Sequence, residues 1–113
     1  SITMKGKEGA EQIAALMDKL RNNPPKEFGQ WKVEEFRDYK TGKTLEMATG
    51  KEGKTGLPAS NVLYFALDND AWCCARPSGT EPKIKFYMGV KGKDLADAVK
   101  LQDELTKAVK ALI

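Results

Sequence analysis

Apolar residues recur at helical spacing near the start of the chain, and the segment is predicted to be a helix over residues 7–22. The residues spaced i, i+3, i+4, i+7 along one face are Ile13, Leu16, Met17 and Leu20. Prolines at positions 24 and 25 end this pattern, because proline lacks a backbone donor and disfavours helix in the residue before it.

Four later segments have the residue patterns of β-strands: residues 31–39, 62–67, 71–75 and 83–90. In the first, the alternation slips between Val33 and Phe36, which predicts a bulge or an edge position. The second is continuously apolar, as expected for a strand buried on both faces.

Short connections join these strands and make antiparallel pairing the expected arrangement. Asn69 and Asp70 predict a tight turn between the second and third strands. In the last strand the apolar and polar positions alternate cleanly, so that Lys83, Lys85 and Tyr87 share one face.

A second helix is predicted over residues 93–113. Its apolar face is expected to contain Leu95, Val99, Gln102, Leu105, Val109 and Leu112. The order is helix, four strands, helix. It predicts an α+β two-layer sandwich over residues 1–113, with a four-stranded, mostly antiparallel sheet and both helices on one face.

Residues 40–61 are rich in glycine and lysine and have no sustained period. Loops of this length inside a compact domain are usually functional or mobile, so we expect residues 40–61 to form a functional or mobile loop.

The composition of the chain excludes several kinds of function. The chain has 113 residues with 41% hydrophobic and 31% charged content and a net charge of +3, as in an ordinary globular domain. No apolar run approaches the ~20 residues of a membrane span, and the opening residues lack a signal-peptide pattern, so we expect a cytoplasmic protein without membrane contact. Histidine is absent, and the only cysteines, Cys73 and Cys74, are adjacent. These features disfavour zinc binding and triad hydrolysis and favour reduced thiols.

The segment from Arg76 to Pro82 is the strongest candidate for a site, because each residue type in it suits a phosphate. The arginine offers a planar fork of donors, Ser78 and Thr80 offer hydroxyls, and Gly79 lets successive amides turn toward one point. Lys85 lies on the polar face of the following strand and can add a second positive charge. The same residue types also occur in any tight turn, so composition alone leaves the phosphate site open.

Two segments imitate a phosphate-binding P-loop, Gly42-Lys43-Thr44 and Gly53-Lys54-Thr55. The motif requires a glycine five positions before its second glycine, where this chain has Arg37 and Ala48. Neither segment satisfies the motif, so nucleotide hydrolysis is not expected.

The segment from Arg76 to Pro82, with Lys83-Ile84-Lys85-Phe86-Tyr87 after it, resembles the phosphate-binding signature in the C-terminal domain of α-D-phosphohexomutases. The likeness covers nearly the whole chain. It includes Thr55-Gly56-Leu57-Pro58, Asn61-Val62-Leu63-Tyr64-Phe65 and Asn69-Asp70-Ala71-Trp72, and it is strongest for the phosphoglucomutase branch.

The resemblance implies that Arg76, Ser78, Gly79 and Thr80 hold the substrate phosphate that is not transferred. Lys85 takes the position of a basic residue that often joins them. Some relatives have arginine there, and lysine is a point charge rather than a fork.

The resemblance also implies a larger multidomain enzyme, a phosphoglucomutase or phosphomannomutase that interconverts hexose 1- and 6-phosphates through a bisphosphate. The serine that carries the phosphoryl group, the Mg²⁺ loop and the sugar-reading loop of such enzymes have no counterpart in these residues. The expected partners are therefore a sugar phosphate and other domains of the same chain. No catalytic or metal-binding residue is expected in this domain, which should be inactive alone.

Two other functions fit a four-stranded sheet with two helices. One is a small nucleic-acid-binding module, which the mild positive charge allows. However, the basic residues are scattered and no RNA-recognition signature is present, so nucleic acid is not the favoured partner. The other is a free-standing, phosphate-dependent regulatory domain that has kept the loop without serving a mutase.

Overall fold

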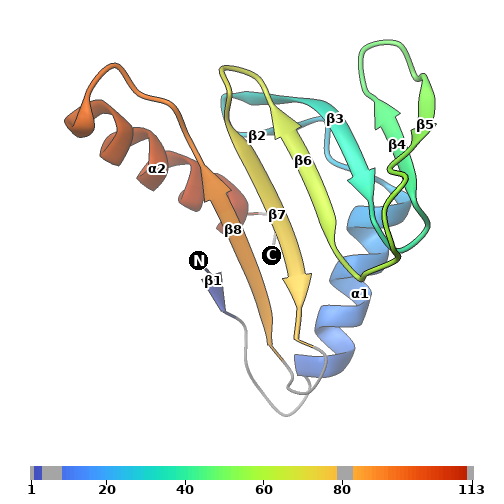
Figure 1. Ribbon diagram of the computed structural model, residues 1–113. Coiled ribbons are helices and arrows are strands. Elements are labelled where there is room, and N and C mark those ends of the chain that lie inside the picture. Colours follow the sequence, from blue (N-terminus) through green and yellow to red (C-terminus); the bar gives the residue numbers. More distant parts are fainter. Residues whose placement is uncertain (1, 4–8, 79–82, 112–113) are drawn as a thin grey trace.

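The computed structural model describes residues 2–3, 9–78 and 83–111. It contains two helices, α1 (Gly9–Asn22) and α2 (Leu95–Lys110). The strands, shown in Figure 1, are β1 (Ile2–Thr3), β2 (Glu27–Phe28), β3 (Trp31–Asp38), β4 (Lys43–Glu46), β5 (Glu52–Lys54), β6 (Leu63–Leu67), β7 (Trp72–Pro77) and β8 (Ile84–Gly89).

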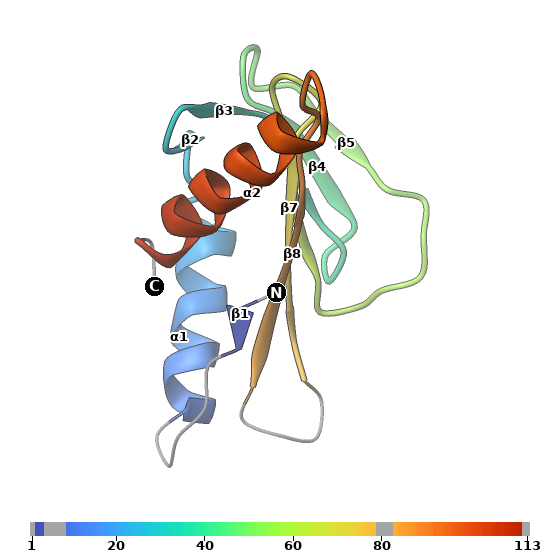
Figure 2. The ribbon, with the colours of Figure 1, turned by 90° about the vertical axis from the view of Figure 1, so that its left-hand side faces the viewer.

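The sheet is antiparallel throughout and has the order β1-β8-β7-β6-β3-β4-β5, while β2 pairs with β3 off this path. Both helices cover one face of it (Figure 2). The expected α+β class, the antiparallel pairing and the two helices on one face are confirmed. The four predicted strands form the contiguous centre β8-β7-β6-β3.

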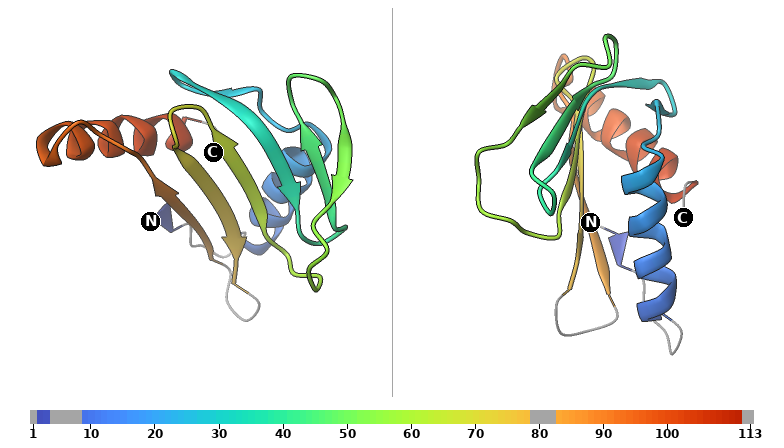
Figure 3. Two further views of the ribbon diagram at one scale, coloured as in Figure 1. Left: turned by 45° about the horizontal axis from the view of Figure 1, so that its top comes forward. Right: turned by 90° about the vertical axis from the view of Figure 1, so that its right-hand side faces the viewer.

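The expected number of strands was wrong, because β1, β2, β4 and β5 were not predicted. The hairpin of β4 and β5 occupies much of residues 40–61, which were expected to be a loop, and it extends the sheet at the edge remote from β8 (Figure 3). All three residues of β5 are exposed, so no alternating burial marks the strand. Glycines 42 and 50 have positive φ values of 76° and 74° and supply the turns on either side of β4.

The core lies between the helices and the inward-facing side chains of the central strands. In β6, for example, Leu63, Phe65 and Leu67 are buried and the residues between them are half-buried. The apolar face predicted for α1 is confirmed, since Ile13, Met17 and Leu20 belong to the same buried cluster. Because both helices pack on this face, no helix of the described part of the chain covers the opposite face of the sheet.

Two local irregularities agree with the sequence. The pairing of β3 with β6 shifts register between Val33 and Glu35, which confirms the predicted bulge, although β3 lies inside the sheet. Asn69 and Asp70 have φ values of 55° and 59°, so both central residues of the β6–β7 connection are left-handed. This is the conformation of a type I′ hairpin turn, in which asparagine and aspartate are favoured.

The predicted apolar face of α2 was partly wrong. Leu105 and Val109 are fully buried, but Leu95 is 81% and Val99 is 62% exposed. The first turns of α2 extend past β8 (Figure 1), away from the central strands that carry the core. Leu112 lies outside the described residues. Asp94 is the N-cap of α2, and its side chain accepts a hydrogen bond from the backbone N–H of Asp97.

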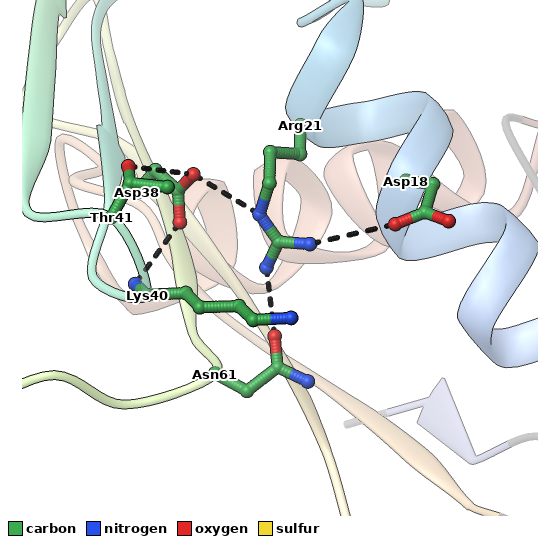
Figure 4. A network of polar contacts seen from close by, with 6 residues as sticks. All are labelled: Asp18, Arg21, Asp38, Lys40, Thr41 and Asn61. Atoms are coloured by element: carbon green, nitrogen blue, oxygen red, sulfur yellow. Dashed lines mark hydrogen bonds and ion pairs between the residues drawn. The ribbon is translucent and has the colours of Figure 1, made fainter.

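A polar network joins the end of α1 to the strand β3 (Figure 4). The carboxylate of Asp38, which is 4% exposed, accepts hydrogen bonds of 3.0 Å from Arg21 Nε, the Thr41 hydroxyl and the Lys40 backbone N–H. The Arg21 guanidinium also donates to Asn61 at 2.7 Å. One arginine thus links α1, β3 and the segment before β6.

Asp38→Asn should lower the free energy of unfolding by about 2 kcal/mol, because it removes a charged partner from a mostly buried guanidinium. Urea unfolding measures this as a lower midpoint with an unchanged slope. The matched control is Asp103→Asn, which removes an exposed ion pair with Lys107 (3.2 Å) and should cost less than about 0.5 kcal/mol. Equal effects of the two substitutions would contradict a structural role for the Arg21–Asp38 pair.

Candidate functional site

The β7–β8 hairpin brings three of the five predicted phosphate-binding residues together. Arg76 and Lys85 are directly opposite each other on the paired strands. Just after the end of β7, the backbone N–H of Ser78 donates to the carbonyl of Lys83 at 2.8 Å and closes the hairpin. Gly79 and Thr80 lie outside the described residues.

Arg76 and Lys85 form a cluster of positive charge that has no counter-charge among the described residues. Both side chains are exposed, and neither makes an ion pair with a carboxylate in the described part of the chain. Like charges directly opposite each other on neighbouring strands repel and destabilise the sheet. An anion bound between them would relieve this repulsion, so the pair favours phosphate binding.

A groove continues from Arg76 along the helix-free face of the sheet. It has a volume of about 560 Å³ and is lined by Ser60, Val62, Tyr64, Trp72, Cys74, Arg76 and Tyr87. The segment between β5 and β6, which includes Ser60, bows out on this same side (Figure 2). The groove volume is within the range of ligand sites, ~300–1,000 Å³.

The register explains the shape of the groove. Cys74 is paired with Tyr64 on one side and with Tyr87 on the other, while Trp72 and Arg76 are its same-face neighbours along β7. A small thiol is therefore surrounded by four large side chains, and it forms the floor of the depression.

Trp72 is held by two contacts. Its ring stacks on Tyr64, with centroids 6.1 Å apart and an interplanar angle of 11°. Its indole Nε1 also lies so close to Gly89 that a Cβ at that position would overlap it. On the far side of Tyr64, the Arg37 guanidinium lies 5.0 Å from the ring centroid. Hydrogen bonding to Tyr39 and Glu35 raises the pKa of Arg37, so this charge is permanent.

The two cysteines face opposite sides of the sheet, as expected for neighbours on a strand, and both are free thiols. Burial raises the pKa of Cys73 to about 12. Burial also raises the pKa of Cys74, and the positive charge of Arg76 partly opposes this shift. Both thiols are therefore protonated near neutral pH, and neither is an activated nucleophile.

The sequence did not reveal the groove. Tyr64 and Trp72 lie in two segments for which the sequence predicts only strands. The available signal was the alternation itself, which places Trp72, Cys74 and Arg76 on one face of β7. What could not be seen was the register, which puts the two tyrosines beside Cys74.

The described residues contain no group of three or more metal-ligating side chains, and the expectation that this domain binds no metal stays a prediction. Within the described part of the chain, no helix has the length and hydrophobicity of a membrane span.

Comparison with known proteins identifies relatives of the chain. Residues 3–108 match the family model described as the phosphoglucomutase/phosphomannomutase C-terminal domain. A phosphoglucomutase of Staphylococcus aureus is 38% identical over 97 residues, which cover 86% of this chain and 17% of the relative. A probable phosphomannomutase of Haemophilus influenzae is 39% identical over 102 residues, covering 90% of this chain and 18% of the relative.

The chain therefore spans about a sixth of the length of these relatives. No solved structure gave a significant match. The resemblance to this family is confirmed, and the nucleic-acid-binding alternative gains no support from these comparisons.

Gly89→Ala should displace Trp72 from its position over β8, because the added methyl group overlaps the indole. We expect a loss of about 1–3 kcal/mol in the free energy of unfolding, as for other overpacked sites. A change in native-state tryptophan fluorescence should accompany it, since the other tryptophan, Trp31, is buried on the opposite side of the sheet. Unchanged fluorescence and stability would contradict the close contact between Trp72 and Gly89.

Proposed function

Because the chain belongs to the family of phosphoglucomutase and phosphomannomutase C-terminal domains, we propose that it binds the non-transferred phosphate of a phosphohexose. The binding residues in this proposal are Arg76, Ser78, Gly79, Thr80 and Lys85. The observation that carries it is the juxtaposition of Arg76 and Lys85 near the turn of the β7–β8 hairpin, without a compensating carboxylate among the described residues.

Each residue has a distinct role in the proposed phosphate clamp. The Arg76 guanidinium pairs with two phosphate oxygens at once, and Lys85 adds a point charge from the neighbouring strand. The hydroxyls of Ser78 and Thr80 and the backbone around Gly79 donate further hydrogen bonds. Because Arg76 and Lys85 are in the same sheet, their spacing is fixed before the ligand arrives, which reduces the entropic cost of binding.

The parent enzyme in this proposal is a cytoplasmic phosphohexomutase. It moves phosphate between the 1- and 6-positions of a hexose through a bisphosphate that turns over in the active-site cleft. Phosphoryl transfer depends mainly on positioning and charge neutralisation. The phosphoserine, the Mg²⁺ site and the sugar-reading loop would belong to other domains of the same chain.

The clamp would serve this reaction by positioning the substrate. Holding the distant phosphate uses intrinsic binding energy to orient the phosphate that reacts, in either direction of the sugar. Closure of the domain over the substrate would exclude water from the reacting phosphate. The isolated domain would bind the substrate weakly and would not catalyse the reaction.

Glucose 1,6-bisphosphate should bind this 113-residue chain with a Kd around 1 mM, or ~4 kcal/mol, since the rest of the cleft is missing. An NMR titration should show amide shifts centred on Arg76, Ser78 and Lys85. Arg76→Ala should reduce the affinity at least tenfold, as expected for loss of a hydrogen bond to a charged group. Lys85→Arg should retain binding.

The matched control for charge is Lys107→Ala, which removes a surface lysine on α2 without touching the β7–β8 hairpin. If Arg76→Ala and Lys107→Ala weakened binding equally, the interaction would be a general effect of net charge. That outcome would overturn the phosphate clamp.

A further inference from the structure

We propose that the β4–β5 hairpin and the end of α1 form a second ligand site, which binds a small organic anion with an apolar body. The two Gly-Lys-Thr segments that fail as P-loops meet in this hairpin, where Lys43 is directly opposite Lys54. Residues of α1 line the site, so it is on the helix-covered side of the sheet. It is also at the edge remote from β8 (Figure 3), and is therefore separate from the proposed phosphate clamp.

A pocket of about 310 Å³ lies between the end of α1 and the sheet. Its apolar lining consists of Pro24, Phe36 and Leu45, and Arg21 and Lys43 contribute positive charge. Phe36 is buried and is opposite Leu45 in the register of β3 and β4, so the two side chains form a continuous apolar floor. The volume is near the lower limit of ligand sites, ~300–1,000 Å³, which suits a small ligand.

The wall formed by α1 is held in place by the polar network of Figure 4. Arg21 Nε donates to Asp38 at 3.0 Å, and the same guanidinium donates to Asn61 at 2.7 Å. Asp38 is thus committed to Arg21, and it makes no ion pair with Lys43, its cross-strand partner in the described part of the chain. A wall that is fixed before the ligand arrives lowers the entropic cost of binding.

Lys43 and Lys54 are a pair of like charges at the rim of this pocket. Both are exposed, and neither makes an ion pair among the described residues. Glu52, which also lines the pocket, offsets only one of the two lysines, so the rim stays positive. Like charges directly opposite each other destabilise a sheet, and an anion next to both ammonium groups would relieve their repulsion.

The combination of an apolar floor and a positive rim defines the class of ligand. The floor would bind an apolar ring, and the ammonium groups would bind a carboxylate or a phosphate attached to it. A free inorganic anion would not use the floor, and a neutral ring would leave the two lysines without a counter-charge. The expected ligand is therefore an aromatic carboxylate or an aromatic phosphate ester.

The test is an NMR titration of the 113-residue chain with phenyl phosphate and with benzoate, and with inorganic phosphate and phenol as controls. Amide shifts at Lys43, Leu45 and Lys54 should appear with at least one aromatic anion. Its affinity at these residues should be about fivefold higher than that of either control, because each control lacks one half of the interaction. A response to benzoate alone identifies a carboxylate ligand, and a response to phenyl phosphate alone identifies a phosphate ester.

Lys43→Gln should lower this affinity about fivefold, because it removes one of the two charges at the rim. Leu45→Trp should abolish binding by filling the space above the floor. The matched control is Lys51→Gln, which removes an exposed lysine of the same hairpin outside the pocket and should leave the affinity unchanged. Arg76→Ala should also leave the shifts at Lys43 and Leu45 unchanged, since the clamp is a separate site. The amide spectrum of each variant verifies that the fold is intact.

Failure of this inference is distinguishable from failure of the clamp, whose shifts are at Arg76 and Lys85. Absence of shifts at Lys43 and Lys54 with both aromatic anions would overturn the second site and leave the clamp untouched. Equal losses in Lys43→Gln and Lys51→Gln would mean a general attraction to surface charge and would also overturn it. Inorganic phosphate bound as tightly as the aromatic anions would overturn the apolar floor and, with it, the proposed class of ligand.

Discussion

The pairing of β7 with β8 is the constraint on which the candidate site depends. Because side chains alternate strictly along a strand, one register determines which residues face the helices and which face the groove. In the observed register Cys73, Ala75, Ile84 and Phe86 are buried, and Arg76 is opposite Lys85. A shift of one strand by a single residue would bury charges and expose the core. The energy of the core thus fixes the relative position of Arg76 and Lys85.

The alternation of side chains between the two faces of the sheet also explains where the helices and the groove lie. Both helices lie on one side, and their apolar residues complete the core with the inward-facing side chains of the sheet. The Arg21–Asp38 pair fixes α1 to β3 where the two elements meet. The other face has no helix, so its aromatic and basic side chains stay available to a ligand. A site on a sheet face has a rigid floor, which suits a function based on positioning.

The sequence predicted the elements whose signal is local. Apolar periodicity marked α1 and the four central strands, Asn69 and Asp70 marked a turn, and the slip after Val33 marked the bulge. β4 and β5 were missed because their residues are mostly exposed and therefore show no alternation of burial. Leu95 and Val99 were misplaced because helical periodicity identifies a face, but not how far the helix extends beyond its sheet.

The candidate site was likewise predicted only in part from the sequence. Arg76, Ser78 and Lys85 could be proposed from residue types and from the resemblance, because the proposed phosphate-binding residues are nearly contiguous in sequence. The groove could not be proposed, because Tyr64, Cys74 and Tyr87 come from three strands and meet only through the register. This difference has a physical consequence. A phosphate clamp on one hairpin persists as long as that hairpin forms, whereas a groove across three strands depends on the whole sheet. Under the proposed function, phosphate recognition is therefore the more robust of these two features.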